Sequence, residues 1–220
     1  AAGIDLVGLD VSLAGQCVPF GTDLLFAASD LRDFVFHLEI CEDFWAADPP
    51  STQGALAGAL ILCNLSASNI VVGKSDDRAV LCASQSMRCL AAYIYSAAGP
   101  GESTTDLAWD GQGSIHELGV QLACTERFPD KSQMAVADVD VERLRLERIA
   151  ETFRRRLDVP RLRLARRPEG ALAQAGNQGV LVDDLRQREV NELRRERDAG
   201  QVVFARLGIA GRTVGVEFAR

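Results

Sequence analysis

The chain has little of what metal sites are built from. Only two of its 220 residues are histidines, His37 and His116, and no two of its cysteines form a C-x-x-C pair. A zinc site would have to be assembled from isolated positions, so we expect no metal centre. The scattered thiols also indicate reduced cysteines rather than disulfides. The six cysteines are Cys17, Cys41, Cys63, Cys82, Cys89 and Cys124.

Long apolar runs are also missing. No stretch approaches the 18 or so apolar residues of a membrane span, and the first residues lack the charged and apolar regions of a signal peptide. We therefore expect a cytoplasmic protein with no membrane partner. The length and the hydrophobic content of 47% suit one domain, or one domain with an appendage.

Charge is divided unevenly along the chain. Residues 1–141 hold 6 basic and 19 acidic residues, whereas residues 142–220 hold 18 arginines and 12 acidic residues. An arginine-rich tail can be a nucleic-acid surface. Here the arginines alternate with acids at helical spacing and few aromatics lie among them, which favours a solvated helix face and no nucleic-acid partner.

A cysteine follows directly on a predicted strand. The stretch 34–50 reads FVFHLEICEDFWAADPP, and its aromatic and β-branched first half is typical of a largely buried strand. The acidic pair Glu42 and Asp43 ends that strand and leaves Cys41 in the turn. Reactive groups in α/β folds lie at the carboxyl ends of strands. An inert buried thiol is the alternative, because free cysteine is among the most buried residue types.

The rest of the pattern alternates strands and helices. We expect a short helix capped by Ser51 or Thr52, and a helix capped by Ser75 or Asp76 that runs to about residue 91. If strands 34–40 and 60–65 are parallel neighbours, the polar run NLSASN after the second strand lies at the same rim as Cys41. Further strands are expected at 60–65, 93–99, 134–141, 202–207 and 213–218, with hairpins over 99–128 and helices over 141–157 and about 181–198. This order predicts an α/β fold.

Several motifs in order carry a family resemblance. They are VPFGTDLLF, HLEICEDFW, the Pro-Pro turn with ALAGA, NLSASN, SQSMRCLAAYIYSAAG, GESTTDLAWDG, ERFP and ADVD. Together, over about residues 1–148, they closely resemble the glutaminase domain of bacterial glutamine-dependent NAD+ synthetases, a carbon–nitrogen hydrolase domain of the nitrilase superfamily. The resemblance implies a four-layer αββα sandwich. Residues 1–141 would be the C-terminal half of this domain, and residues 142–220 a connector helix and an Arg-rich helical tail.

The resemblance also implies roles for single residues. Cys41 would be the nucleophile that forms a thioester with glutamine, and Glu42 a carboxylate that orders the substrate. Ser68 and Lys74 match positions that hold the glutamine, although relatives commonly carry arginine where this chain has Lys74. The stretch 101–106 resembles a loop that borders the active site.

Two members of the family's Glu, Lys, Cys triad have no match. The 40 residues before Cys41 contain no lysine and only one glutamate, Glu39, which lies in the same strand as the cysteine. A thiol needs a nearby cation or base to become nucleophilic. We therefore expect a partial domain that is inactive alone. Half of such a sandwich exposes one face of each sheet, so we also expect the isolated chain to behave poorly. The intact protein is expected to form a homo-oligomer.

The expected partners follow from the same resemblance. They are glutamine and a synthetase domain, which would use ATP and Mg2+ to amidate nicotinic acid adenine dinucleotide, while the glutaminase part needs no cofactor. No Gly-rich pyrophosphate loop follows residue 148. A stand-alone amidase of the nitrilase family and a non-catalytic interaction module are the alternatives.

Overall fold

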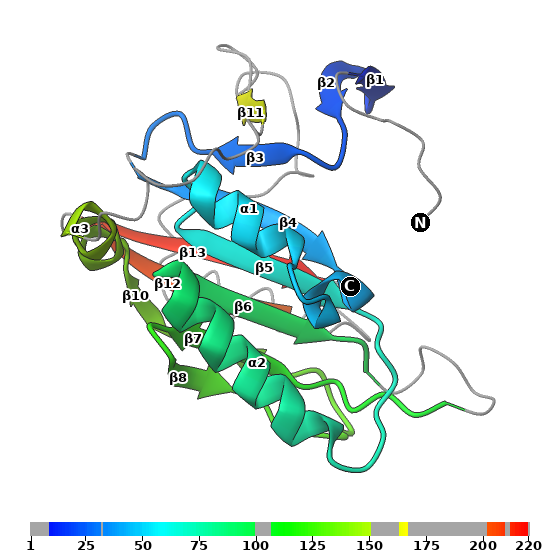
Figure 1. Cartoon of the computed structure of the whole chain (residues 1–220). Coiled ribbons are helices and arrows are strands. Elements are labelled where there is room, and N and C mark those ends of the chain that lie inside the picture. Colours follow the sequence, from blue (N-terminus) through cyan, green and yellow to red (C-terminus); the bar gives the residue numbers. More distant parts are fainter. Residues whose placement is uncertain are drawn as a thin grey trace.

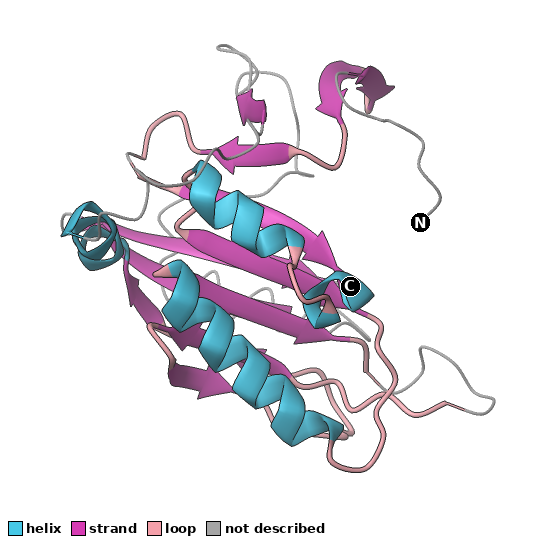
Figure 2. Cartoon of the chain, viewed as in Figure 1, coloured by secondary structure: helices cyan, strands magenta, loops and turns pink. Residues whose placement is uncertain are grey.

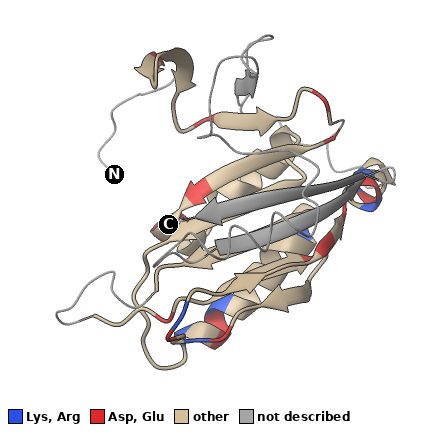
Figure 3. Ribbon diagram, turned by 180° about the vertical axis from the view of Figure 1, so that it is seen from behind, with Lys and Arg blue, Asp and Glu red and all other residues tan. Residues whose placement is uncertain are grey.

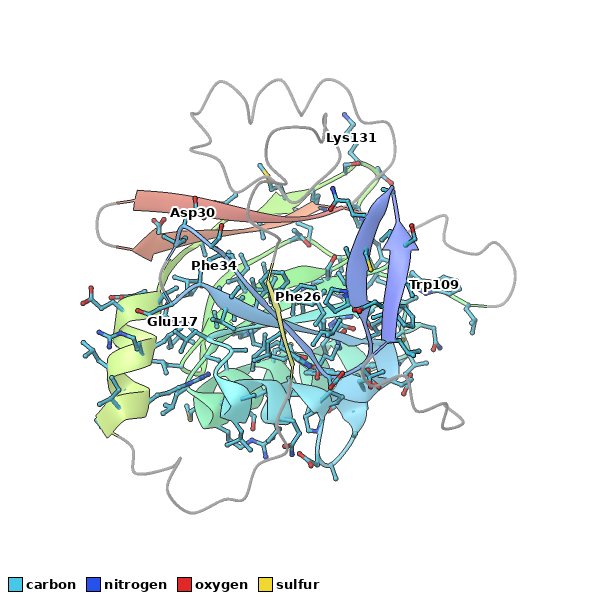
Figure 4. All side chains as sticks on the ribbon, turned by 90° about the horizontal axis from the view of Figure 1, so that it is seen from above. Phe26, Asp30, Phe34, Trp109, Glu117 and Lys131 are labelled. Atoms are coloured by element: carbon cyan, nitrogen blue, oxygen red, sulfur yellow. The ribbon has the colours of Figure 1, made fainter. Side chains whose placement is uncertain are left out.

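A computed structural model describes residues 9–31, 33–99 and 107–150, together with the backbone of strands 163–166, 202–209 and 212–219. Two helices cover one face of a central mixed sheet, and a smaller sheet lies over its other face (Figures 1 and 4). The predicted α/β class is confirmed. In space, the helices, the central sheet and the small sheet are stacked in this order, which corresponds to three successive layers, α, β and β, of the predicted αββα sandwich. The expected helix over about 181–198 and the loop 101–106 lie outside the described residues.

The central sheet has the strand order β11-β3-β4-β5-β6-β7-β8. Its middle strands β4, β5 and β6 run parallel, whereas β7 and β8 extend the sheet as an antiparallel hairpin. Helices α1 and α2 connect the parallel strands and lie on one face of the sheet (Figure 2). The elements are β3 (Leu24–Ala27), β4 (Val35–Ile40), α1 (Pro50–Ala57), β5 (Ile61–Ser66), α2 (Lys74–Cys89), β6 (Ala92–Ala97), β7 (Gly113–Glu117), β8 (Val120–Cys124) and β11 (Arg163–Arg166).

The small sheet is built around the hairpin of β12 and β13, which confirms the two strands expected near the C-terminus. The strand expected over 134–141 is observed as two segments, β9 and β10, which pair with β12 in parallel and in one register, with no pairing at residues 136 and 137. Val141 instead begins α3 (Val141–Ala150). An antiparallel pair, β1 with β2, precedes the central sheet. These elements are β1 (Leu9–Leu13), β2 (Gln16–Phe20), β9 (Met134–Ala135), β10 (Asp138–Asp140), β12 (Val202–Ile209) and β13 (Arg212–Ala219).

Alternate residues of β5 and β6 feed two separate cores. On the helix side, Leu62 and Tyr93 pack with side chains from α1 and α2, including Ala55 and Cys82. On the other side, the core contains Phe34, which directly precedes β4, and residues from the strands and from α3, namely Ile61, Cys63, Ile94, Ile115, Val139 and Leu144. Burial on both faces explains why these strands are almost continuously apolar.

Both helices begin earlier than the expected caps. α1 has Pro49 as its N-cap and Pro50 at its first position, so the expected caps Ser51 and Thr52 are wrong. Proline fits the first helical position, where a backbone N–H would have no partner within the helix. α2 has Gly73 as its N-cap in a left-handed conformation, which places the expected caps at positions 75 and 76 within the first turn.

The helix α3 is fixed to the ends of the two sheet-covering helices. The guanidinium of Arg148 donates hydrogen bonds to the carbonyl oxygens of Cys89 and Leu90 at the end of α2, over 2.9 to 3.1 Å, and to that of Ala55 in α1, over 3.0 Å. Carbonyl groups in the last turn of a helix lack partners within the helix and attract cations. Figure 3 shows the chain from behind, with basic residues in blue at α3 and near the start of α2.

Candidate functional site

Cys41 lies in a tight turn at the carboxyl end of β4. Its backbone is left-handed, with φ +54°, and it opens the short 3-10 helix η1 (Cys41–Trp45). The backbone N–H of Ile40 donates to the Asp43 carboxylate over 3.1 Å, which closes the turn. A left-handed cysteine costs about 1–2 kcal/mol, and such strained residues cluster at functional sites. The side chain of Cys41 is half-buried.

The segment after β5 reaches the same rim of the sheet. β4 and β5 pair in parallel, with Ile40 opposite Leu65. Cys41 and the segment 67–69 therefore follow neighbouring strand ends at one rim, as the sequence predicted, whereas Asn64 and Ser66 belong to β5 itself. Ser68 is buried there, although a polar side chain at a strand end is usually exposed.

Ser68 and Lys74 contact each other directly. The ammonium of Lys74 donates to the Ser68 hydroxyl over 2.6 Å and to the Asn69 carbonyl over 2.9 Å. It also lies 5.2 Å from the centroid of the Trp45 ring. Two of the predicted substrate residues thus meet beside η1, and one N–H of the ammonium has no hydrogen bond within the described part of the chain.

Glu42 is exposed on η1, next to Cys41. Among the residues that the structure describes, no hydrogen bond or ion pair joins it to Ser68 or Lys74. Ser68 and Lys74 contact each other, and Trp45, at the end of the Cys41 turn, lies beside Lys74. Glu42 shares the turn without contacting the pair.

Glu39 is held inside the fold and away from solvent. Its carboxylate accepts hydrogen bonds from the Tyr93 hydroxyl and, over 2.8 Å, from the backbone N–H of Ser51 in the first turn of α1. Burial, and then the charge of Glu39, raise the pKa of Tyr93 well above its usual value. The only glutamate upstream of Cys41 therefore anchors β4 to α1 and β6.

Other thiols of the chain differ from Cys41 in their surroundings. Cys63, Cys82 and Cys89 are buried, and burial raises the pKa of Cys82 to about 12 and that of Cys89 to about 11. Thiols in such apolar surroundings are unreactive at neutral pH. Cys17 and Cys124 are exposed at the surface.

Sequence reasoning missed the residues that support this rim from below. Arg78, one turn after Lys74 on α2, forms a buried ion pair with Asp110 at 2.6 Å, and the Trp109 indole N–H donates to the Ala67 carbonyl over 3.3 Å. Trp109 and Asp110 belong to the motif GESTTDLAWDG, but nothing in the motif indicated that Trp109 contacts the segment after β5 or that Asp110 pairs with α2.

The part of the chain that the structure describes contains neither a metal cluster nor a membrane-spanning helix. No group of three or more His, Cys, Asp or Glu side chains in this part of the chain could hold a metal ion. Within the same residues, no helix has the length and apolar character needed to cross a bilayer.

Comparisons with known proteins give close sequence relatives. The chain is 60% identical over 139 residues to the glutamine-dependent NAD(+) synthetase of Mycobacterium tuberculosis, a match that covers 63% of this chain and 20% of the relative. The protein of the same name from Mycobacterium leprae is 61% identical over 131 residues, which cover 60% of this chain and 19% of that one. The chain thus spans about one fifth of the length of these relatives. No protein-family model matches the chain.

Solved structures match more weakly. A glutamine-dependent NAD(+) synthetase from Cytophaga hutchinsonii is 26% identical, with 55% of this chain and 19% of that chain covered and a TM-score of 0.43. A score below 0.5 does not establish a shared fold, so the relationship rests on the sequence. Over about three fifths of its length, the chain is homologous to a segment of the glutamine-dependent NAD(+) synthetases.

Proposed function

We propose that this chain carries the nucleophile of a glutamine amidohydrolase that supplies ammonia to an NAD+ synthetase. The observation that carries the proposal is the left-handed Cys41 turn at the same rim as the Ser68–Lys74 pair. In this proposal, the position of Cys41 and the homology to glutamine-dependent enzymes both support attack of a cysteine on the amide of glutamine. The chain is a small part of those enzymes, so the activity of the whole belongs to the proposal.

The reaction would run through a thioester. The Cys41 thiol gives its proton to a base, and its sulfur forms a bond to the carboxamide carbon of glutamine. The C–N bond then breaks, and the nitrogen leaves as ammonia with the added proton. Water attacks the thioester carbon, which releases glutamate and restores the thiol.

Charge and hydrogen bonding suggest how glutamine is held. The N–H of Lys74 that has no hydrogen bond among the described residues suits the α-carboxylate of the substrate, and Ser68 supports the ammonium from the other side. The exposed carboxylate of Glu42 suits its α-ammonium group. The Glu39 carboxylate is already bonded to Tyr93 and Ser51, so it is a poor general base for Cys41. The general base and the lysine that stabilises the oxyanion would then come from another segment, the one that carries the Glu and the Lys of the family's Glu, Lys, Cys triad.

The downstream chemistry belongs to the same proposal. The ammonia would amidate nicotinic acid adenine dinucleotide in a synthetase domain that uses ATP and Mg2+. That domain and a homo-oligomer of the intact enzyme are the partners we propose, and cytoplasm is the proposed location.

Ammonia release from L-glutamine tests the proposal. The chain is supplied with the segment that bears the family's Glu and Lys, taken from the Mycobacterium tuberculosis relative. We expect hydrolysis that Cys41→Ser abolishes and that L-asparagine does not support. Equal turnover of simple aliphatic amides would favour a stand-alone amidase, and hydrolysis unchanged by Cys41→Ser would overturn the assignment of the nucleophile.

A further inference from the structure

Two hydrogen bonds tie the segment after β5 to the segment before β7. The backbone N–H of Ile70 donates to the carbonyl of Ala108 over 2.8 Å, and the Trp109 indole N–H donates to the carbonyl of Ala67 over 3.3 Å. These bonds lie on either side of Ser68. Trp109 is buried, and Figure 4 shows it at the end of the sheet opposite α3 and Glu117. The position of Ser68 therefore depends on residues 108 and 109.

The next residue, Asp110, is fixed by a buried ion pair. Its carboxylate accepts two hydrogen bonds from the Arg78 guanidinium, over 2.6 and 3.2 Å, with side-chain exposures of 1% and 5%. Arg127, which is 38% exposed, donates to the same carboxylate over 3.1 Å. Burial alone would raise the pKa of Asp110, but the hydrogen bonds and charge of Arg78 outweigh it and the pKa is lowered.

Because Arg78 is fixed by Asp110, it also restricts the position of Lys74 on the same helix. The two residues are four apart on α2, and side chains at this spacing lie on one face of a helix. The Arg78 guanidinium also lies 5.2 Å from the Tyr95 ring centroid and donates to the Gln112 side chain over 2.6 Å. The first turn of α2, with Lys74, is thus held against the loop that holds Ser68.

A buried ion pair adds little stability compared with an apolar pair of similar size. Its value in this place is geometric, because Arg78 and Asp110 fix one orientation of α2 against the loop. We propose that Trp109, Asp110 and Arg78 form a brace that positions Ser68 and Lys74 for substrate. The identity of that substrate, glutamine, rests on the proposed function.

The lysine content of the chain gives a direct probe of the brace. The sequence contains two lysines, Lys74 and Lys131, so incorporation of lysine labelled with 13C at Cε gives two side-chain NMR signals. Lys74 is held near the Trp45 ring, whose ring current displaces its signal from the solvent value. The exposed Lys131 serves as an internal reference.

Three variants are compared in the full chain. Trp109→Phe keeps an aromatic ring and removes the indole N–H, and Asp110→Asn keeps the shape of the carboxylate and removes its charge. Arg127→Gln is the matched control, because it removes the exposed partner of Asp110 and leaves the pair with Arg78 intact. Asp110→Asn leaves the buried charge of Arg78 without its carboxylate partner, which can prevent folding. Trp109→Phe creates no such charge, so it keeps the test valid in that case.

We expect the Lys74 signal to move toward the Lys131 position in Trp109→Phe and Asp110→Asn, and to stay in place in Arg127→Gln. A Lys74 signal unchanged in both brace variants would overturn the inference. Titration with L-glutamine should move the Lys74 signal of the wild type, with an apparent Kd about fivefold higher in Trp109→Phe, as loss of one hydrogen bond implies. No response of the wild type would contradict glutamine binding, and hence the proposed function, while the result on the brace stands.

Discussion

The ammonium of Lys74 lies 5.2 Å from the ring centroid of Trp45, four residues after Cys41. This contact joins the turn that carries the cysteine to the first turn of α2. A cation over an indole ring contributes about 0.5–1 kcal/mol when partly exposed. The two hydrogen bonds of the same ammonium, to Ser68 and Asn69, add to this and hold the charge at the rim.

Replacement of Lys74 by methionine should weaken substrate binding without changing the cysteine. The variant keeps the length of the side chain and removes the charge, so we expect the apparent Kd for glutamine to rise at least tenfold. The rate at which neutral iodoacetamide modifies Cys41 should stay within about twofold. Lys131→Met is the control. An unchanged Kd for glutamine would show that Lys74 does not hold the substrate.

Gly54→Ala should destabilise the protein although alanine is the better helix former. A Cβ at this position of α1 would meet ring and Cβ atoms of the buried His37 at 2.5 to 2.9 Å. Overpacking of this kind costs about 1–3 kcal/mol, which exceeds the gain of about 1 kcal/mol in helix propensity. Urea denaturation measures the difference. In a His37→Gly background, which also removes the Cβ of residue 37, the same substitution should become neutral or stabilising, and a loss that persists there would point to another cause.

Arg148→Ala should lower the free energy of unfolding by about 1.5–3 kcal/mol. The substitution leaves the carbonyl groups of Cys89, Leu90 and Ala55 without their cationic donor. Arg148→Lys should recover only part of the loss, because an ammonium cannot reach both helix ends with the fork of a guanidinium. The exposed Arg143 provides the control substitution to alanine. Equal effects at both arginines in urea denaturation would refute a specific role for Arg148.

Stability should fall between pH 6.5 and pH 4 because of a buried histidine. Burial lowers the pKa of His116 from 6.5 to about 4, so in this interval the unfolded chain binds a proton that the folded chain does not. The free energy of unfolding is then unaffected above pH 6.5 and decreases as the pH falls, by up to about 3 kcal/mol. The pKa of His37 is lowered in the same direction, mainly by burial. His116→Gln should flatten this slope in denaturation at pH 7, 6 and 5, and an unaltered slope would exclude His116 as its source.

The position of Cys41 could be predicted from the sequence because it depends on local pattern. An alternating aromatic and β-branched run ended by Glu42 and Asp43 places the cysteine at a strand end. The Asp43 carboxylate then closes the turn by accepting a hydrogen bond from the Ile40 N–H. The pairing of the NLSASN segment with that rim needed only the assumption that β4 and β5 are parallel neighbours. The left-handed backbone of Cys41 could not be read from its residue type, because non-glycine residues rarely adopt it.

The contacts across the fold could not be predicted in the same way. The bond between Arg78 and Asp110 spans 32 residues, and that between Tyr93 and Glu39 spans 54. Both depend on the order of strands in the sheet, which a single sequence does not specify. The helix starts at Pro50 and Lys74 were missed for a simpler reason, since serine and aspartate near a helix N-terminus suggested caps that Pro49 and Gly73 supply instead.

The most direct test of the proposed function is covalent labelling by a diazo-ketone analogue of glutamine, followed by peptide mapping. The chain is compared alone and together with the relative's segment that carries the triad Glu and Lys, with Cys41→Ala as the control. We predict labelling at Cys41, only when that segment is present, and none in Cys41→Ala. Labelling at another residue, or labelling that persists in Cys41→Ala, would contradict the assignment of Cys41 as the glutamine-reactive nucleophile, and equally fast labelling of the chain alone would contradict its need for an external Glu and Lys.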